Sequence, residues 1–355
     1  MFNLHELIQT KSLLFFGGKG GVGKTTLSAA TALLAANNNR KVLLVSTDPA
    51  HNLGHLLDRS IGSTIITAYE NLDVLELDPQ ETIKQHLSET SSVLRQLMPI
   101  QLASEVDKHI ELSRHAPGMN EAAMLERIAQ IVIESARHYD LVIFDTAPSG
   151  HTAQLMALPE MMTAWTDGLL KRRDKSEKLS EKINKLSNHQ DDKKSIGDNI
   201  FGTKKTDSNL SEKTQQRDGK IRSILNRRRQ RFSDLRSHLI DKKNTAFVIV
   251  LAAERIPVLE TIELYQQLNE MKISIAGGII NKRLPDNYDC ENKAFNNKDT
   301  LENIDSFLIE RKTQEKDHLK TLSDALPKLP TMSIPLSKHD IIGLDALAEF
   351  SQQLQ

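Results

Sequence analysis

A glycine-rich stretch near the start of the chain, residues 17–26, holds the residues best suited to bind phosphate. It reads Gly-Gly-Lys-Gly-Gly-Val-Gly-Lys-Thr-Thr, and residues 18–25 fit the pattern G-x-x-x-x-G-K-[ST]. Glycines let the backbone curl so that successive N–H groups face one anion, and a helix that begins at about Lys24 adds its positive end. In such a loop Lys24 would contact the β- and γ-phosphates of a nucleotide, and the Thr25 hydroxyl would hold Mg²⁺. A flexible glycine-rich turn is the alternative. The predicted nucleotide contacts from this loop are Gly18, Gly20, Gly21, Val22, Gly23, Lys24, Thr25 and Thr26.

A second lysine, Lys19, stands near the start of the same loop. It cannot easily reach the γ-phosphate of its own site alongside Lys24. It is better placed to reach the phosphates of a facing subunit, as a lysine version of the arginine finger supplied in trans. The alternative is a solvated surface lysine. We therefore predict catalytic roles for Lys24 and, across a dimer interface, for Lys19.

Two aspartates follow apolar runs and complete the predicted chemistry. Asp48 comes after residues 41–46, where its carboxylate could orient and deprotonate the attacking water. Asp145 follows four apolar residues in the Walker B arrangement and would hold Mg²⁺ directly or through water. Each aspartate could instead be a helix cap or a turn residue.

These residues need a scaffold, and short continuous apolar runs indicate strands that are buried on both faces of a sheet. Helix-length amphipathic stretches, for example 257–271, separate most of the runs. The pattern predicts an α/β protein with a doubly wound, mainly parallel sheet, in which the loops after Phe16, Ser46, Phe144 and Ile280 converge on one site. The predicted strands are 12–16, 41–46, 73–77, 141–145, 246–252, 275–281 and 331–334.

Further predicted contacts lie in the loops after these strands. Asn281 could read the adenine edge through its amide, Pro335 and Leu336 could pack on the base, and Asn52 lies near the phosphates. Two loops are expected to respond to the γ-phosphate as order–disorder switches. The predicted switch residues are Pro49, Ala50, His51, Pro148, Gly150 and His151.

Two long helical stretches interrupt the alternation of strands and helices. We predict a nucleotide-binding domain from residues 1–81, 138–154 and 242–355, and a helical subdomain from residues 82–137 and 155–241. Apolar side chains such as Met156, Met161, Met162 and Trp165 follow a helical spacing. They are either core or an adaptable groove for an apolar partner, since clustered methionines suit promiscuous surfaces.

The bulk properties are those of an ordinary globular chain of 355 residues with a net charge of −1 and one cysteine. We see no secretory signal and no apolar run long enough to span a membrane, and a single cysteine fits a reducing compartment such as the cytoplasm. Basic residues gather in 171–231, most densely at 227–231. This region is either a solvated helix face or an arm for anionic lipid or nucleic acid, and we expect no nucleic-acid partner. The polar residues 187–219 are predicted as a mobile basic loop.

Four stretches together resemble the deviant P-loop ATPases of the arsenical-pump (ArsA) and tail-anchored-protein-targeting family. They are residues 17–26, Ser-Thr-Asp-Pro-Ala-His-Asn at 46–52, Pro-Gly-Met-Asn-Glu-Ala at 117–122 and Asp-Thr-Ala-Pro-Ser-Gly-His-Thr at 145–152. Weaker matches are Ile-Ile-Asn at 279–281 and Ile-Pro-Leu at 334–336. The resemblance implies a homodimer that closes on ATP with Mg²⁺ and opens after hydrolysis, with Lys19 as the signature lysine, Asp48 in switch I and residues 145–152 as switch II.

The family contains two kinds of ATPase, and this chain departs from both. Arsenite-pump members bind the metalloid through thiolates. This chain has one cysteine, Cys290, so a site of three thiolates within one subunit is impossible. Many targeting members share one Zn²⁺ between subunits through Cys-x-x-Cys, but Lys293 stands where the second cysteine would be.

The resemblance therefore favours a dimeric cytosolic ATPase that captures and releases an apolar protein segment, such as the transmembrane segment of a tail-anchored protein. The second hypothesis is an anion-pump subunit that works with a membrane carrier. The third is a positioning ATPase, like the ParA and MinD relatives, that binds DNA or membrane.

Overall fold

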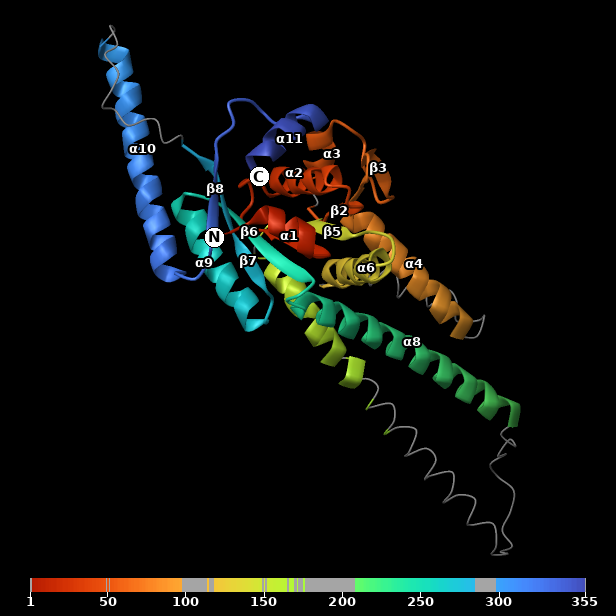
Figure 1. Cartoon of the computed structure of the whole chain (residues 1–355). Coiled ribbons are helices and arrows are strands. Elements are labelled where there is room, and N and C mark those ends of the chain that lie inside the picture. Colours follow the sequence, from red (N-terminus) through yellow and green to blue (C-terminus); the bar gives the residue numbers. More distant parts are fainter. Residues whose placement is uncertain are drawn as a thin grey trace, which may run out of the picture.

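The computed structural model describes residues 2–48, 50, 52–97, 114, 118–148, 150, 152–164, 166–168, 171, 175, 208–284 and 298–354. At its centre lies one eight-stranded sheet (Figure 1). Its strands are β1 (Leu13–Gly17), β2 (Val42–Ser46), β3 (Ile66–Tyr69), β4 (Leu72–Glu76), β5 (Leu141–Asp145), β6 (Thr245–Ala252), β7 (Ile275–Arg283) and β8 (Thr331–Pro335). The strand order is β3-β4-β2-β5-β1-β6-β7-β8, and every neighbouring pair is parallel except β3 with β4. This confirms the predicted α/β fold with a mainly parallel sheet.

The order in which strands are added to the sheet reverses at β1, because β5 lies on one side of β1 and β6 lies on the other. In such sheets ligands bind outside the carboxyl ends of the strands at this switch point. The loops after β1, β2, β5 and β7 therefore open on the same edge, as predicted.

Helices cover both faces of the sheet. On one face, apolar side chains of α1 (Leu4–Thr10), α2 (Lys24–Asn37), α3 (Asn52–Leu57) and α11 (Gly343–Ser351) share a core with Leu14 and Phe16 of β1. On the other face, α6 (Met119–Ser135), the C-terminal end of α8 (Ser208–Ile240) and α9 (Arg255–Glu270) pack against Leu13 and Phe15. The alternation along β1 divides the core because successive side chains of a strand point to opposite faces.

The second core contains an aromatic stack across three neighbouring strands. The ring of Phe15 stacks on Phe144 at a centroid distance of 5.0 Å and on Phe247 at 6.3 Å. Side chains of this size remove a large apolar area from water, so they fix the register of β5, β1 and β6 directly beneath the loops at the carboxyl edge.

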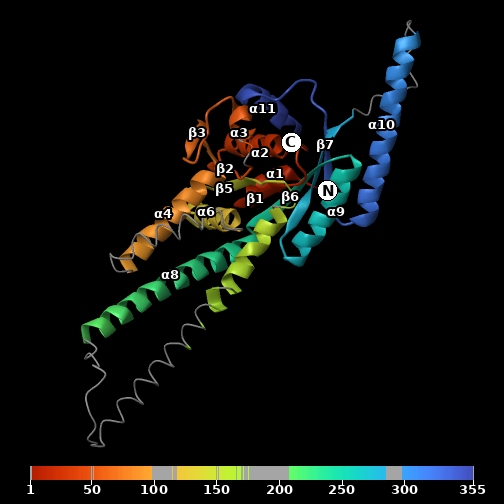
Figure 2. The same cartoon turned by 180° about the vertical axis from the view of Figure 1, so that it is seen from behind.

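Some helices project beyond the sheet. In Figure 1, α8 and α4 (Pro79–Leu97) extend from one side, and α10 (Lys298–Ala325) extends from the other side; Figure 2 shows the same arrangement from behind. α6 and the C-terminal part of α8 nevertheless pack against the sheet, because their side chains Ile128, Val132, Phe232 and Leu235 lie in its core. The division into a nucleotide-binding domain and a helical subdomain stays a prediction.

Two expectations about local structure were wrong. β3 was not predicted; it is a four-residue edge strand in which only Ala68 is buried. Residues 208–219 were predicted as part of a mobile loop, but they form the first turns of α8. The stretch is mainly polar in sequence, yet most of its residues favour or tolerate a helix, and a long helix can continue into solvent. The rest of that predicted loop, 187–207, lies outside the described residues.

Candidate active site

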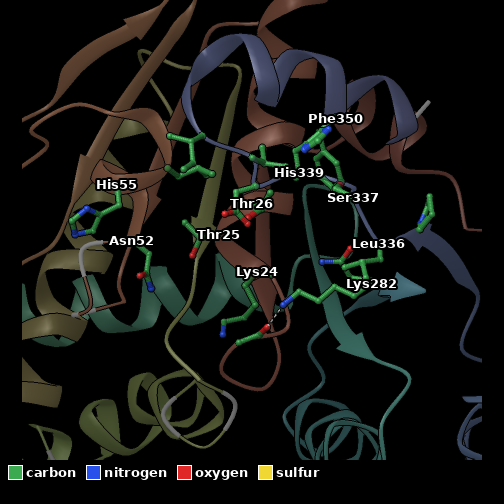
Figure 3. A pocket seen from close by; sticks show the side chains of 18 of the residues that line it. Lys24, Thr25, Thr26, Asn52, His55, Lys282, Leu336, Ser337, His339 and Phe350 are labelled. Carbon is green, nitrogen blue, oxygen red and sulfur yellow. Dashed lines mark hydrogen bonds between the residues drawn. The ribbon is translucent and has the colours of Figure 1, made fainter. Parts of the chain in front are cut away.

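A pocket of about 590 Å³ opens at the carboxyl edge of the sheet. Its walls come from the glycine-rich loop, the start of α3, the ends of β7 and β8, and α11 (Figure 3). The pocket collects side chains from distant parts of the chain, as the convergence of loops predicted. The predicted residues that line it are Gly21, Gly23, Lys24, Thr25, Thr26, Asp48, Asn52, Asn281, Pro335 and Leu336.

The glycine-rich loop needs glycine at two positions for reasons visible in its surroundings. Gly18 has φ of +147°, and a Cβ atom there would lie 2.0 Å from the carbonyl oxygen of Val250. Gly23 has φ of +95°, and a Cβ atom there would lie 2.4 Å from Nδ2 of Asn281. Side chains rarely adopt such backbone angles and cannot tolerate such distances, so only glycine fits.

Lys24 is the first residue of α2, where the prediction placed the helix start, and only 4% of it is exposed. Its Nζ donates a hydrogen bond of 3.1 Å to the carbonyl oxygen of Lys19. Burial lowers the pKa of Lys24, whereas the charges of Asp145, Asp48 and Glu260 oppose that shift. An ammonium group that lies near three carboxylates and lines the pocket is suited to receive an anion.

Thr25 and Asp145 meet beneath the loop. The Thr25 hydroxyl donates a hydrogen bond of 2.6 Å to Oδ2 of Asp145, which is fully buried at the end of β5. Among the described residues, Oδ1 of Asp145 is buried without a hydrogen-bond partner. Burial raises the pKa of Asp145 to about 7, although the Thr25 hydrogen bond and the charge of Lys24 lower it in part. A buried carboxylate oxygen without a partner beside a hydroxyl group is a donor set that suits a small hard cation such as Mg²⁺.

Asp48 follows β2 and lines the same pocket. Its Oδ1 accepts a hydrogen bond of 3.1 Å from the Ala50 amide, and its Oδ2 accepts one of 3.4 Å from Nδ2 of Asn52. The carboxylate therefore organises its own loop by two contacts, one of them long. Pro49 and His51, the other predicted switch residues of this loop, lie outside the described residues.

The second predicted switch follows β5. Pro148 lies beside the glycine-rich loop, because a Cβ atom on Gly20 would lie 3.7 Å from its Cγ. The carbonyl oxygen of Pro148 accepts a hydrogen bond of 3.3 Å from the Thr152 amide. Gly150 has open space around its Cα, and His151 lies outside the described residues. The switch roles of both loops stay predictions.

The end of β7 is tied to the glycine-rich loop by two neighbouring side chains. Nδ2 of the buried Asn281 donates a hydrogen bond of 2.9 Å to the Val22 carbonyl oxygen. Nζ of Lys282 donates one of 2.9 Å to the Gly21 carbonyl oxygen, drawn as a dashed line in Figure 3. Asn281 thus has a structural contact in addition to the adenine contact that we predicted, and the latter stays a prediction.

Lys19 is held by another element of its own subunit. Its Nζ lies 3.1 Å from Oε1 of Glu260 on α9, and the side chains are 31% and 34% exposed. The ammonium group is therefore neither buried in the pocket nor a freely solvated cation.

Sequence reasoning missed several residues of the pocket. Ser337, His339, Asp340, Ile341 and Ile342 follow β8, and the rule that ligands gather outside carboxyl ends could have indicated them. His55 and Leu56 lie one helical turn after Asn52, which helical spacing could have indicated. For Lys282 the signal is its place next to Asn281. Phe350 reaches the pocket from α11 without any signal in the sequence.

The predicted apolar stripe divides between core and surface. Met156 is 1% exposed and belongs to the core beneath the sheet, whereas Met161 is 64% exposed. Trp165 lies outside the described residues, as do residues 98–113 of the predicted helical subdomain, so the groove stays a prediction. Within the described residues, no helix is long and apolar enough to span a membrane.

The basic cluster at 227–231 is largely engaged in ion pairs. Arg228 and Arg231 contact Glu126, and Arg229 contacts Asp167. This favours the interpretation of a structural and solvated helix face over an arm for lipid or nucleic acid. Cys290 and Lys293 lie outside the described residues. In the described part of the chain, no group of three or more histidine, cysteine or acidic residues could hold a metal ion.

Taken together, the parallel sheet, the glycine-rich loop at its switch point and the Thr25–Asp145 pair define a P-loop nucleotide-binding protein with a second lysine in its loop. The family model for anion-transporting ATPases, ArsA_ATPase, matches residues 11–355, and the chain belongs to this family. Its members are ATPases, and so this chain is an ATP hydrolase.

Relatives align over almost the whole chain. A protein of Aquifex aeolicus named "Putative arsenical pump-driving ATPase 2" is 31% identical over 96% of this chain and 98% of its own length. "ATPase ASNA1 homolog 1" of Paramecium tetraurelia is 29% identical over 98% of this chain and 93% of its own length. "ATPase get3" of Sclerotinia sclerotiorum is 28% identical over 99% of this chain and 92% of its own length. The resemblance drawn from the motifs is therefore confirmed.

Proposed function

We propose that the chain is a homodimeric, Mg²⁺-dependent ATPase that couples ATP binding and hydrolysis to the capture and release of a hydrophobic protein segment. The observation that carries the hydrolytic part is the Thr25–Asp145 pair beneath a pocket that Lys24 and Asp48 also line. Oδ1 of Asp145 is buried and has no hydrogen-bond partner in the part of the chain that the structure describes. Similarity to proteins named ATPase get3 over nearly the full chain supports the part that concerns the client.

Thr25 and Asp145 would hold the magnesium ion. Both offer oxygen atoms, which Mg²⁺ prefers, and a cation beside Asp145 favours its carboxylate form over the protonated form. The ion would neutralise charge on the β- and γ-phosphates of ATP.

The remaining steps belong to residues of the chain. Lys24 would exchange its hydrogen bond to the Lys19 carbonyl for contacts to the β- and γ-phosphates. Asp48 would accept the proton of the attacking water, and its contacts to Ala50 and Asn52 would transmit this change to the loop. Lys19 of the second subunit would contact the γ-phosphate and stabilise its charge in the transition state.

The client would bind to the helices that project from the sheet, in the proposed helical subdomain 82–137 and 155–241. The exposed Met161 belongs to this region, and methionines adapt to varied apolar partners. We propose a transmembrane segment of a client, together with a membrane receptor or carrier, as the partner, and the cytoplasm as the compartment.

The name of the Aquifex aeolicus relative favours a second candidate, an anion-pump subunit that works with a membrane carrier. The single cysteine argues against a thiolate site for arsenite, so this candidate needs an anion site of another chemistry. Stimulation of ATP hydrolysis by arsenite or antimonite would support it.

The experiment that tests the proposal uses Asp48→Asn with ATP and two soluble fusion proteins. One fusion carries a single apolar transmembrane segment, and the matched fusion carries the same segment with three leucines replaced by aspartate. We expect the variant to retain the apolar fusion with ATP and to release it with ADP. Equal retention of both fusions, or retention that ignores the nucleotide, contradicts client capture.

Turnover measurements test the catalytic residues separately. Lys19→Ala and Asp48→Asn should each abolish ATP hydrolysis while ATP binding stays measurable, because neither side chain is a predicted phosphate contact within its own site. Hydrolysis at the wild-type rate in either variant contradicts the role assigned to that residue.

A further inference from the structure

The side chain and the backbone of Lys19 are both held within its own subunit. Its Nζ lies 3.1 Å from Oε1 of Glu260 on α9, and its carbonyl oxygen accepts the hydrogen bond from Lys24 at 3.1 Å. Glu260 and Lys19 are far apart in the sequence and meet because β6, which precedes α9, is the parallel neighbour of β1. Both side chains are about one-third exposed, so the ion pair lies at the surface beside the pocket.

We propose that Glu260 is a positioning residue that retains Lys19 in its own subunit until two copies of the chain close on ATP. This inference rests on the proposed function, because the phosphates that Lys19 would contact belong to the other subunit of the dimer. When the dimer closes, the Lys19 ammonium group leaves Glu260 and contacts the γ-phosphate of the ATP bound in the partner subunit.

The chemistry of the two side chains makes these contacts mutually exclusive. A lysine ammonium is a compact charge at the end of a flexible stem, and it can move between nearby anions. Direct contact with a carboxylate on its own subunit and with a γ-phosphate across an interface would require it to occupy two places. The ion pair therefore stabilises the separated state and opposes closure.

The same competition favours ATP over ADP. The triphosphate presents the terminal phosphate that Lys19 would contact, whereas ADP lacks it, so only ATP offers an anion that replaces the carboxylate well. A ligand shifts an equilibrium between two states only by its differential affinity for them. Glu260 thus increases the difference in affinity between the closed and separated states that a nucleotide needs in order to close the dimer.

The test is the self-association of purified full-length chain, measured by analytical ultracentrifugation with Mg²⁺ and either ATP or ADP. Glu260→Gln keeps the size of the side chain and removes its charge. We expect it to dimerise with ATP at a lower protein concentration, by about two- to fivefold for each ion pair released. With ADP, the variant should also dimerise more than the wild type.

Two comparisons separate a charge effect from a structural one. Glu263→Gln makes the same change on the exposed face of α9 and should behave as the wild type. The difference between Glu260→Gln and the wild type should shrink as salt rises, because exposed ion pairs are screened. Glu260→Asp retains the charge but retracts the carboxylate by one methylene, and it should give an intermediate result.

Unchanged or weaker dimerisation of Glu260→Gln with ATP overturns the inference. If it is unchanged while Lys19→Ala still abolishes turnover, the proposed function stands and only the role of Glu260 fails. If the wild type does not dimerise with ATP and Lys19→Ala hydrolyses ATP normally, both the proposed function and this inference fail.

Discussion

The Thr25 hydroxyl and the Asp145 carboxylate are joined by a hydrogen bond of 2.6 Å that links the first turn of α2 to the end of β5. This contact brings a residue of the glycine-rich loop to a fully buried aspartate whose Oδ1 has no hydrogen-bond partner among the described residues. The contact is possible because β5 pairs with β1, which leads into the glycine-rich loop and α2. It also brings together the two oxygen-bearing side chains that we propose as magnesium ligands, one of which, Thr25, lines the pocket.

Asp145→Asn should abolish the effect of Mg²⁺ on nucleotide binding and reduce turnover by about 100-fold or more, because an amide cannot supply the negative charge. Calorimetric titration with ATP, with and without Mg²⁺, measures the first effect, and steady-state hydrolysis measures the second. Asp324→Asn on the exposed face of α10 is the matched control. Wild-type dependence on Mg²⁺ in Asp145→Asn would show that the ion is held elsewhere.

The pKa of Asp145 predicts how stability changes with pH in the nucleotide-free protein. Burial raises this pKa from the ordinary 3.8 to about 7, so the folded state holds a proton that the unfolded chain has released. The stabilisation is complete below about pH 4, decreases as pH rises, and is lost once pH passes the folded pKa near 7. A pKa shift of about three units corresponds to at most about 4 kcal/mol in the free energy of unfolding.

Urea unfolding of the wild type and of Asp145→Asn between pH 5 and pH 8 checks this expectation. The asparagine variant does not titrate, so its free energy of unfolding should increase relative to the wild type up to about pH 7 and then stay level. Parallel curves across the whole range would contradict the raised pKa.

The scaffold could be predicted because buried parallel strands are continuous apolar runs with a simple signature. β1, β2, β4, β5, β6, β7 and β8 all overlap the predicted strands. β3 was missed because a short edge strand with two exposed side chains, Thr67 and Tyr69, lacks that signature. The helix that begins at Lys24 and the carboxylate of Asp145 followed from local spacing alone.

Contacts between distant residues could not be predicted in the same way. Glu260 lay within the predicted helix 257–271, but nothing local indicated that it meets Lys19, because their proximity depends on the pairing of β1 with β6. Lys282 is similar, since its contact to Gly21 follows from where β7 ends relative to the loop. The order of strands in the sheet decides which residues that are distant in the sequence lie close together, and the periodic pattern of apolar residues does not reveal that order.

Gly23→Ala should reduce ATP affinity by about tenfold, because a methyl group would meet Nδ2 of Asn281 at 2.4 Å in a backbone conformation that disfavours side chains. The second change, Asn281→Ala, removes the atom that the methyl group meets, so it should cost less affinity in the Gly23→Ala variant than it costs in the wild type. Binding of a fluorescent ATP analogue measures each variant.

Gly21→Ala separates strain from steric overlap in this experiment. Gly21 also has a positive φ, of +81°, but a Cβ atom there would have no other atom within 4 Å. Adding Asn281→Ala to Gly21→Ala should therefore give additive effects, whereas the same addition to Gly23→Ala should not. Additivity in both pairs would contradict the close approach of Gly23 and Asn281.

Glu126→Gln should destabilise the contact between α4, α6 and α8. The Glu126 carboxylate lies 2.9 Å from Nδ1 of His86 on α4. It also lies 2.9 Å from Arg231 and 3.7 Å from Arg228, both on α8. The Glu126 side chain is 13% exposed, so its removal leaves positive groups facing one another in a partly desolvated place. We expect a loss of about 2 kcal/mol in the free energy of unfolding, less than for a fully buried pair because the arginines remain partly in water.

The same network has a pH dependence of the opposite sign to that of Asp145. Burial alone would raise the pKa of Glu126, but the His86 hydrogen bond and the arginine charges outweigh it and lower the pKa below the ordinary 4.5. Its stabilisation is therefore present above pH 4.5 and is lost as pH falls through the folded pKa. Urea unfolding of Glu126→Gln and of the control Glu134→Gln, an exposed glutamate on α6, should differ at pH 7 and converge in acid. A difference that persists unchanged at pH 3 would mean that the loss comes from packing instead of charge.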